Sequence, residues 1–196
     1  MSPATGISKL AALTGALLLL QGFFEPAQIQ PGNEPIKTPA CGPRVLVEYT
    51  DDDPDYFIIK NRSADGWSIE TIAFDLTPSS GNLVFDPETG GAGVGGAAGF
   101  VPDQTTDIRL VGTVPAKDGG RTLSLRFQNF THQRDYTFHI DLDASPAGQG
   151  RTWVLPEDMA GTRILVELRG PRGQSDRIDA AFDANAEADT GAGGCV

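Results

Sequence analysis

Six aspartates are the residues whose type and spacing point most directly to chemistry. Four of them crowd one turn between two β-rich runs: Asp51, Asp52, Asp53 and Asp55. Asp141 and Asp143 lie two positions apart at the end of another run and so point to one face of a strand. Calcium takes about six to eight hard oxygen ligands, which loops between strands can supply. We predict a calcium site at 51–55 that Asp141 and Asp143 could complete; a solvated acidic loop is the alternative, because the series lacks the order of an EF-hand.

The chain offers little for hydrolytic catalysis. Its only histidines are His132 and His139, and a nucleophile triad needs a histidine with an orienting acid. His139 stands beside Asp141 on the predicted solvent face of a strand, which favours a cross-strand pair over a general base. We therefore predict that the protein is not an enzyme. A glycan-acting enzyme built on a carboxylate pair is a weaker alternative, because no motif points to one.

Two tryptophans suggest a second kind of site. Trp67 and Trp153 could form an apolar platform for a sugar ring, since the faces of large aromatic side chains suit such contacts. A carbohydrate-binding module is therefore the alternative function. The competing interpretation is that both side chains pack in the core.

A glycine-rich segment, residues 90–99 (GGAGVGGAAG), contains a pattern known from nucleotide-binding proteins. Gly91, Gly93 and Gly96 match G-x-G-x-x-G, but this motif works only where it opens a helix after a strand. Pro102 would end such a helix. We predict instead a loop between strands, whose lack of bulk allows another surface to approach closely.

The elements that must position these residues are β-strands. Between residues 44 and 183, apolar residues alternate with polar ones or form short β-branched and aromatic runs, each ended by Gly, Pro, Asp or Asn. Nine strands are predicted: 44–50, 56–61, 68–76, 82–86, 108–114, 122–130, 136–142, 163–169 and 177–182. They indicate an all-β fold, a single-domain antiparallel β-sandwich of Ig-like or jelly-roll-like type over 44–183.

Both ends of the chain differ in composition from the middle. Leu10–Leu20 is an uncharged apolar run, which suits the core of a signal peptide and is too short for a stable membrane span. We predict a signal peptide over 1–27, a Pro-rich extended arm over 28–43 and a Gly/Ala-rich acidic tail over 184–196. A secreted, periplasmic or cell-surface location follows.

The two cysteines bracket the predicted domain. Cys41 and Cys195 are the only ones in the chain, and in an exported protein such a pair is most simply one disulfide. Two unrelated free thiols are the alternative. Neither cysteine has a second Cys or a His at metal-binding spacing, which argues against a zinc site or redox catalysis.

Four stretches of the sequence resemble a known family. They are Gly66–Glu70 (GWSIE), Phe74–Leu76 (FDL), Leu83–Asp86 (LVFD) and Gly90–Val94 (GGAGV). Together, over roughly 45–182, they resemble small exported bacterial proteins described as aggregation-factor-core-like. The resemblance implies an extracellular β-sandwich with calcium-assisted cell or matrix association, and it assigns no site residue.

These observations lead to one hypothesis about function. The formal net charge of −11 repels a nucleic-acid polyanion and excludes it as a partner. We expect a secreted, non-enzymatic adhesion or matrix-interaction module whose partner is an extracellular protein or a polysaccharide. Self-association through open edge strands is a further expectation, because such edges leave backbone groups unpaired.

Overall fold

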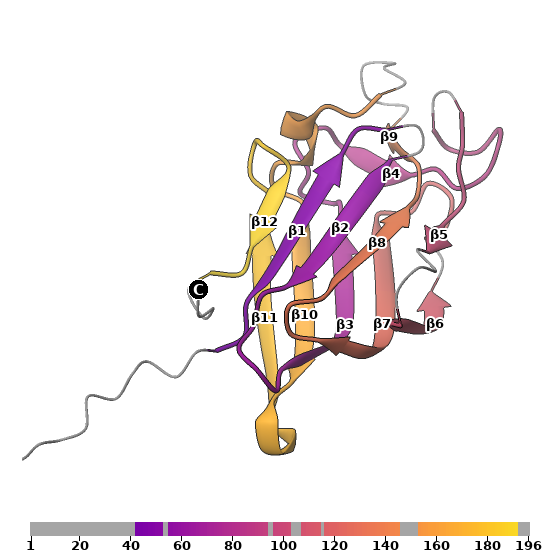
Figure 1. Ribbon diagram of the computed structural model, residues 1–196. Helices are drawn as coiled ribbons and strands as arrows, with labels where there is room; N and C mark the ends of the chain where they lie inside the picture. Colours follow the sequence, from indigo (N-terminus) through magenta and orange to yellow (C-terminus); the bar gives the residue numbers. More distant parts are fainter. Residues whose placement is uncertain are drawn as a thin grey trace, which may run out of the picture. The chain divides into compact units, whose positions relative to one another are not determined.

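The chain folds into β-strands joined by loops and two short 3-10 turns (Figure 1). The computed structural model describes residues 42–52, 55–93, 96–102, 107–114, 116–145 and 153–191. The strands are β1 (Val45–Thr50), β2 (Tyr56–Asn61), β3 (Ser68–Asp75), β4 (Leu83–Phe85), β5 (Val101–Pro102), β6 (Arg109–Val114), β7 (Thr122–Thr131), β8 (Asp135–His139), β9 (Leu142–Ala144), β10 (Arg163–Arg169), β11 (Ser175–Ala181) and β12 (Glu187–Asp189). The 3-10 turns are η1 (Pro156–Met159) and η2 (Pro171–Gly173).

Two five-stranded antiparallel sheets pack face to face. One has the order β12-β1-β2-β8-β5 and the other the order β11-β10-β3-β7-β6, while β4 and β9 pair separately. The all-β sandwich predicted from the sequence is therefore confirmed. Within the described part of the chain, no helix has the length and apolar character needed to cross a membrane.

Alternating burial along the strands builds the core between the sheets. In β2 and β10 every second residue is buried, which is the period of a strand with one wet face. Phe57 of β2 stacks on Phe138 of β8 with ring centroids 4.8 Å apart, and Phe74 of β3 meets Phe57 edge-on at 5.4 Å. Because β3 belongs to the other sheet, this cluster joins the two layers. Burial of each such ring contributes about 1.5–3 kcal/mol.

One predicted strand is divided in the structure. The sequence predicts a single strand over 136–142, but β8 ends at His139 and β9 begins at Leu142. Between them the Ile140 N–H still donates to the Asp55 carbonyl, at 3.1 Å, whereas the next N–H, that of Asp141, donates to the Ala98 carbonyl at 3.0 Å; pairing with the β2 side therefore ends after Ile140. β9 then pairs with β4. This division sets the position of the aspartates on either side of Leu142.

The structure also contains strands that the sequence does not predict. β5 is one, and β12 is another, since it lies within 184–196 where the composition predicts a tail. Ala188 of β12 is buried opposite Val47 of β1, while Glu187 and Asp189 are exposed. Small residues between acidic ones resemble a tail in composition, yet they supply the alternation of a strand. The sheet thus extends past residue 183.

Several predictions concern residues that the structure does not describe. The signal peptide at 1–27, most of the arm at 28–43 and both cysteines, Cys41 and Cys195, lie outside the described residues. They stay predictions from the sequence.

Candidate cation site

The pairing of β4 with β9 brings three aspartates together. Asp86 directly follows β4, and Asp141 and Asp143 flank Leu142 at the start of β9. Phe85 lies opposite Leu142 in the ladder, and the Asp86 N–H donates to the Asp141 carbonyl at 3.0 Å. One carboxylate oxygen from each aspartate consequently lies within 4.8 Å of the others. Such a spacing suits oxygen ligands of a single metal ion.

The three carboxylates are poorly solvated. Asp86 and Asp143 are each 2% exposed, and Asp141 is partly buried. Oδ1 of Asp86 is buried and accepts no hydrogen bond from the described residues. A buried polar atom in that state costs free energy, and the cost is larger when the group carries charge.

Asp86 is held among other carboxyl groups. Burial raises its pKa above the ordinary value, and the hydrogen bonds and negative charge of Asp118 and Asp143 raise it further. No Lys or Arg within the described ranges forms an ion pair with Asp86. A bound cation would offset both the burial and the repulsion.

The glycine segment lies directly against these carboxylates. At Gly93 a Cβ atom would overlap the carboxylates of Asp86 and Asp143, and at Gly91 it would overlap that of Asp118. Asp118 also accepts a backbone N–H from this segment at 3.0 Å. The lack of bulk in this segment thus lets carboxyl groups of the chain itself approach it closely.

A pocket of about 630 Å³ adjoins the three aspartates. It is lined by Asp51, Asp52, Asp55, Gly96, Ala97, Ala98, Asp141, Leu142 and Trp153. Trp153 is 53% exposed, a high value for a large apolar side chain. Asp141 belongs to both the pocket and the group of three aspartates. The pocket therefore offers an aromatic face and several carboxylates next to the candidate cation site.

Asp55 has a structural role in the acidic turn. It is 4% exposed, and its carboxylate accepts the Tyr49 hydroxyl at 2.5 Å and the Leu142 N–H at 2.7 Å. Burial raises the pKa of Asp55 to about 8, although both hydrogen bonds oppose the shift. Asp55 thus ties the turn to β1 and to β9.

Among the described residues, the aspartates that converge are Asp86, Asp141 and Asp143, and none of the described aspartates of 51–55 belongs to this group. Asp141 and Asp143 belong to the group, as the sequence suggests. Of the other predicted ligands, Asp51, Asp52 and Asp55 line the neighbouring pocket. Asp53 lies outside the described residues. Sequence reasoning missed Asp86. It follows a strand directly, but only the β4–β9 pairing shows that the two strand ends meet.

The two tryptophans have different environments. Trp67 is 7% exposed and belongs to the hydrophobic core, so it cannot form part of a sugar platform. Trp153 is the tryptophan that remains available to a ligand.

The fold and the site define an all-β sandwich with an acidic candidate cation site at one group of loops. Comparisons with models of protein families, with curated proteins and with solved structures find no match for this chain.

Proposed function

We propose that the chain is an exported, non-enzymatic β-sandwich that serves as an adhesion or matrix-interaction module, with calcium bound by Asp86, Asp141 and Asp143. The observation that carries this proposal is the group of three converging carboxylates, in which Oδ1 of buried Asp86 accepts no hydrogen bond. Export rests on the apolar run near the N-terminus.

Calcium suits the donor set better than a transition metal. All three side chains offer hard carboxylate oxygens, and no histidine or cysteine from the described part of the chain belongs to the group. Calcium also tolerates irregular geometry and fills its remaining positions with carbonyl oxygens and water. Three carboxylates give the site the negative charge that such an ion requires.

Thermal unfolding of the mature protein tests the calcium site. At a free calcium concentration 100 times Kd, a ligand of the folded state adds about 2.7 kcal/mol. For a domain of this size we expect the unfolding midpoint to rise by roughly 5–11 °C relative to a chelator. The double variant Asp86→Asn/Asp143→Asn should lose this rise, whereas Glu88→Gln, an exposed acidic residue of the same loop, should keep it. A wild-type protein with no rise, or a double variant with a full rise, would contradict the calcium site.

The adhesion role is tested with beads coated with the mature protein. We expect the beads to adhere to extracellular matrix or cell surface in calcium, and to lose adhesion when the coat carries Asp86→Asn/Asp143→Asn. Equal adhesion of the two coats would separate adhesion from the cation site and count against the proposal.

A carbohydrate-binding module is the second candidate, because half-exposed Trp153 lines a pocket with carboxylates. Carboxylates accept hydrogen bonds from sugar hydroxyls while an aromatic face packs on the ring. Affinity electrophoresis in gels that contain neutral polysaccharides would reveal retardation. Trp153→Ala should abolish any retardation, and unchanged migration of the wild type in every gel would remove this candidate.

A further inference from the structure

Asp141 connects the candidate cation site to the pocket beside Trp153. Its carboxylate belongs to the group with Asp86 and Asp143 and also lines the pocket. Its carbonyl accepts the Asp86 N–H at 3.0 Å, and its own N–H donates to the Ala98 carbonyl at 3.0 Å. Ala98 forms part of the pocket wall. One residue therefore contacts both the metal-ligand cluster and the pocket.

The pocket has a strongly acidic lining. Asp51 and Asp52 are exposed and line it together with Asp141, and its described lining contains no Lys or Arg. Such a concave surface of one sign concentrates cations and repels anions. A change in the charge carried near Asp141 must therefore alter which ligands the pocket accepts.

We propose that a divalent cation held by Asp86, Asp141 and Asp143 sets the charge of the pocket beside Trp153. This inference rests on the proposed cation site, to which Oδ1 of buried Asp86 independently points. Without the ion, the pocket presents the carboxyl groups of four aspartates, Asp51, Asp52, Asp55 and Asp141, and disfavours ligands rich in electron-donating oxygen. With the ion, two positive charges lie against Asp141, and the pocket favours an uncharged or anionic saccharide over an organic cation.

The coupling is reciprocal by thermodynamic necessity. If the cation changes the affinity of the pocket for a ligand by some factor, the ligand changes the affinity for the cation by the same factor. The module would then hold its oxygen-rich partner in calcium and release it when calcium is removed. Calcium would thus regulate adhesion through charge as well as through stability.

Quenching of Trp153 fluorescence tests the inference without a ligand. Iodide is an anionic quencher and acrylamide a neutral one, so their ratio reports the local potential. Trp153 is half-exposed whereas Trp67 is buried in the core, so the quenched signal comes mainly from Trp153. At constant ionic strength we expect calcium to raise the Stern–Volmer constant for iodide about twofold. This is the increase in local iodide concentration that two positive charges cause at a distance of roughly one Debye length. The constant for acrylamide should stay the same.

Three variants identify the source of the signal. Asp86→Asn removes a ligand that does not line the pocket, and it should abolish the calcium response of iodide quenching. Glu88→Gln removes an equal charge from the same loop outside the site, and it should retain the response. Trp153→Phe should lose the quenchable signal while keeping the calcium-dependent rise in unfolding temperature.

The outcomes separate this inference from the proposed function. No calcium-dependent rise in unfolding temperature would overturn the cation site itself and, with it, the coupling. A normal rise with unchanged iodide quenching would overturn the coupling alone. Equal rises for iodide and acrylamide would show that Trp153 becomes more exposed, which would also overturn a coupling through charge.

Discussion

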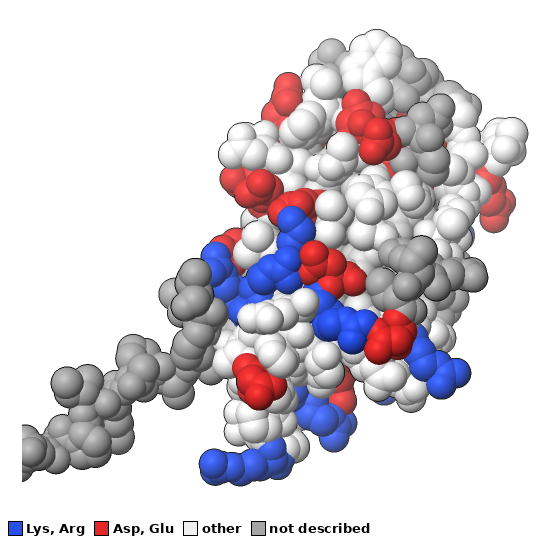
Figure 2. All heavy atoms as spheres, in the orientation of Figure 1, with Lys and Arg blue, Asp and Glu red and all other residues white. Residues whose placement is uncertain are grey.

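Aspartates are paired with arginines in one region of the molecule and gathered against one another in a second. The paired strands, defined as β1, β2, β8 and β12 with their adjoining residues, carry three ion pairs: Arg44–Asp189, Lys60–Glu48 and Arg62–Asp135. The acidic loops carry the following carboxyl groups: Asp51, Asp52, Asp55, Asp86, Asp118, Asp141 and Asp143. On the face shown in Figure 2, described Lys and Arg side chains are absent from the upper part, whereas Asp and Glu side chains occur throughout.

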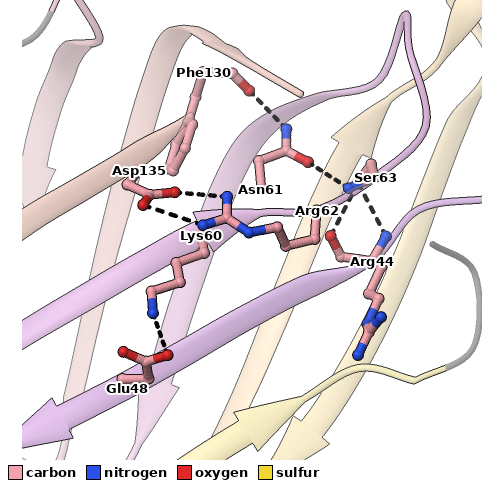
Figure 3. A network of polar contacts seen from close by, with 8 residues as sticks. All are labelled: Arg44, Glu48, Lys60, Asn61, Arg62, Ser63, Phe130 and Asp135. Carbon is pink, nitrogen blue, oxygen red and sulfur yellow. Dashed lines mark hydrogen bonds and ion pairs between the residues drawn. The ribbon is translucent and has the colours of Figure 1, made fainter. Parts of the chain in front are cut away.

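Hydrogen bonds also hold the paired strands, some of them between uncharged groups (Figure 3). Buried Asn61 donates Nδ2–H to the Phe130 carbonyl at 3.0 Å and accepts the Ser63 N–H at 3.1 Å. Arg62 donates two hydrogen bonds to Asp135, at 2.6 and 3.1 Å. Each charge of the three ion pairs thus has a partner supplied by the chain itself.

The comparison shows how one residue type serves two purposes. Beside a guanidinium, a carboxylate gains a charge-assisted hydrogen bond and adds a little stability. Among other buried carboxylates it lowers stability, and it is placed where it could serve as a ligand for a cation from outside. The acidic loops therefore have the properties expected of a functional site, which commonly costs the fold some stability.

The largest expected effect concerns the predicted disulfide. The Thr190 N–H donates to the Val45 carbonyl at 3.1 Å, so β1 and β12, the described strands that lie nearest to the two cysteines in the sequence, are adjacent. Cys41→Ser should lower the free energy of unfolding by about 2–5 kcal/mol, because the closed loop exceeds 100 residues. Urea unfolding in the presence and absence of reductant measures this loss. Two free thiols by titration of the unreduced, denatured protein would rule out the disulfide.

This loss should be the same in calcium and in chelator, since the disulfide would join the paired strands and leave the acidic loops unaltered. If the loss of unfolding free energy in Cys41→Ser depends on calcium, the paired strands and the acidic loops do not act independently.

Gly93→Ala should cause the next largest effect. The added Cβ would overlap the carboxylates of Asp86 and Asp143, and overpacking of this kind costs about 1–3 kcal/mol. Gly99→Ala is the matched control, because its Cβ would make only an ordinary contact, 3.8 Å from the Pro87 carbonyl oxygen. Urea unfolding curves should separate the two variants. Equal stabilities would mean that the carboxylates can move away from Gly93 at little cost.

The sequence predicts local structure well and the meeting of distant segments poorly. Alternating residues identify β2 and β10 because burial of one face leaves a period of two. Nothing in the local pattern shows that Asp86 meets Asp143, since the β4–β9 pairing joins segments far apart in the chain. Trp67 and Trp153 illustrate the same limit: residue type alone does not reveal that one is covered and the other lines a pocket.

Removing one carboxylate should have opposite effects in the two regions. In chelator, Asp86→Asn should raise the free energy of unfolding by about 1–2 kcal/mol, because it removes a buried charge that has other carboxyl groups as neighbours. Asp135→Asn should lower it, by about 0.5 kcal/mol, because it breaks an exposed pair with Arg62. Chemical denaturation shows whether each variant raises or lowers the free energy of unfolding relative to the wild type. If Asp86→Asn proves destabilising in chelator, the view of the acidic loops as a costly site is wrong.

The smallest effect is a dependence of stability on pH in the paired strands. The hydrogen bond from Arg44 lowers the pKa of Asp189, and the N–H of Gly191 and the charge of Arg44 lower it further, while burial opposes the shift. A carboxyl group with a lowered folded-state pKa stabilises the fold above its unfolded pKa, near 3.9, and loses that contribution as the pH falls through the folded value. Asp189→Asn should therefore destabilise by about 0.5 kcal/mol at pH 7 and by less at pH 2–3, since the pair is half-exposed and screened. Unfolding curves of the variant and the wild type at both pH values give the difference between their free energies of unfolding. If this difference increases on acidification, the Arg44–Asp189 pair does not stabilise β12 against β1.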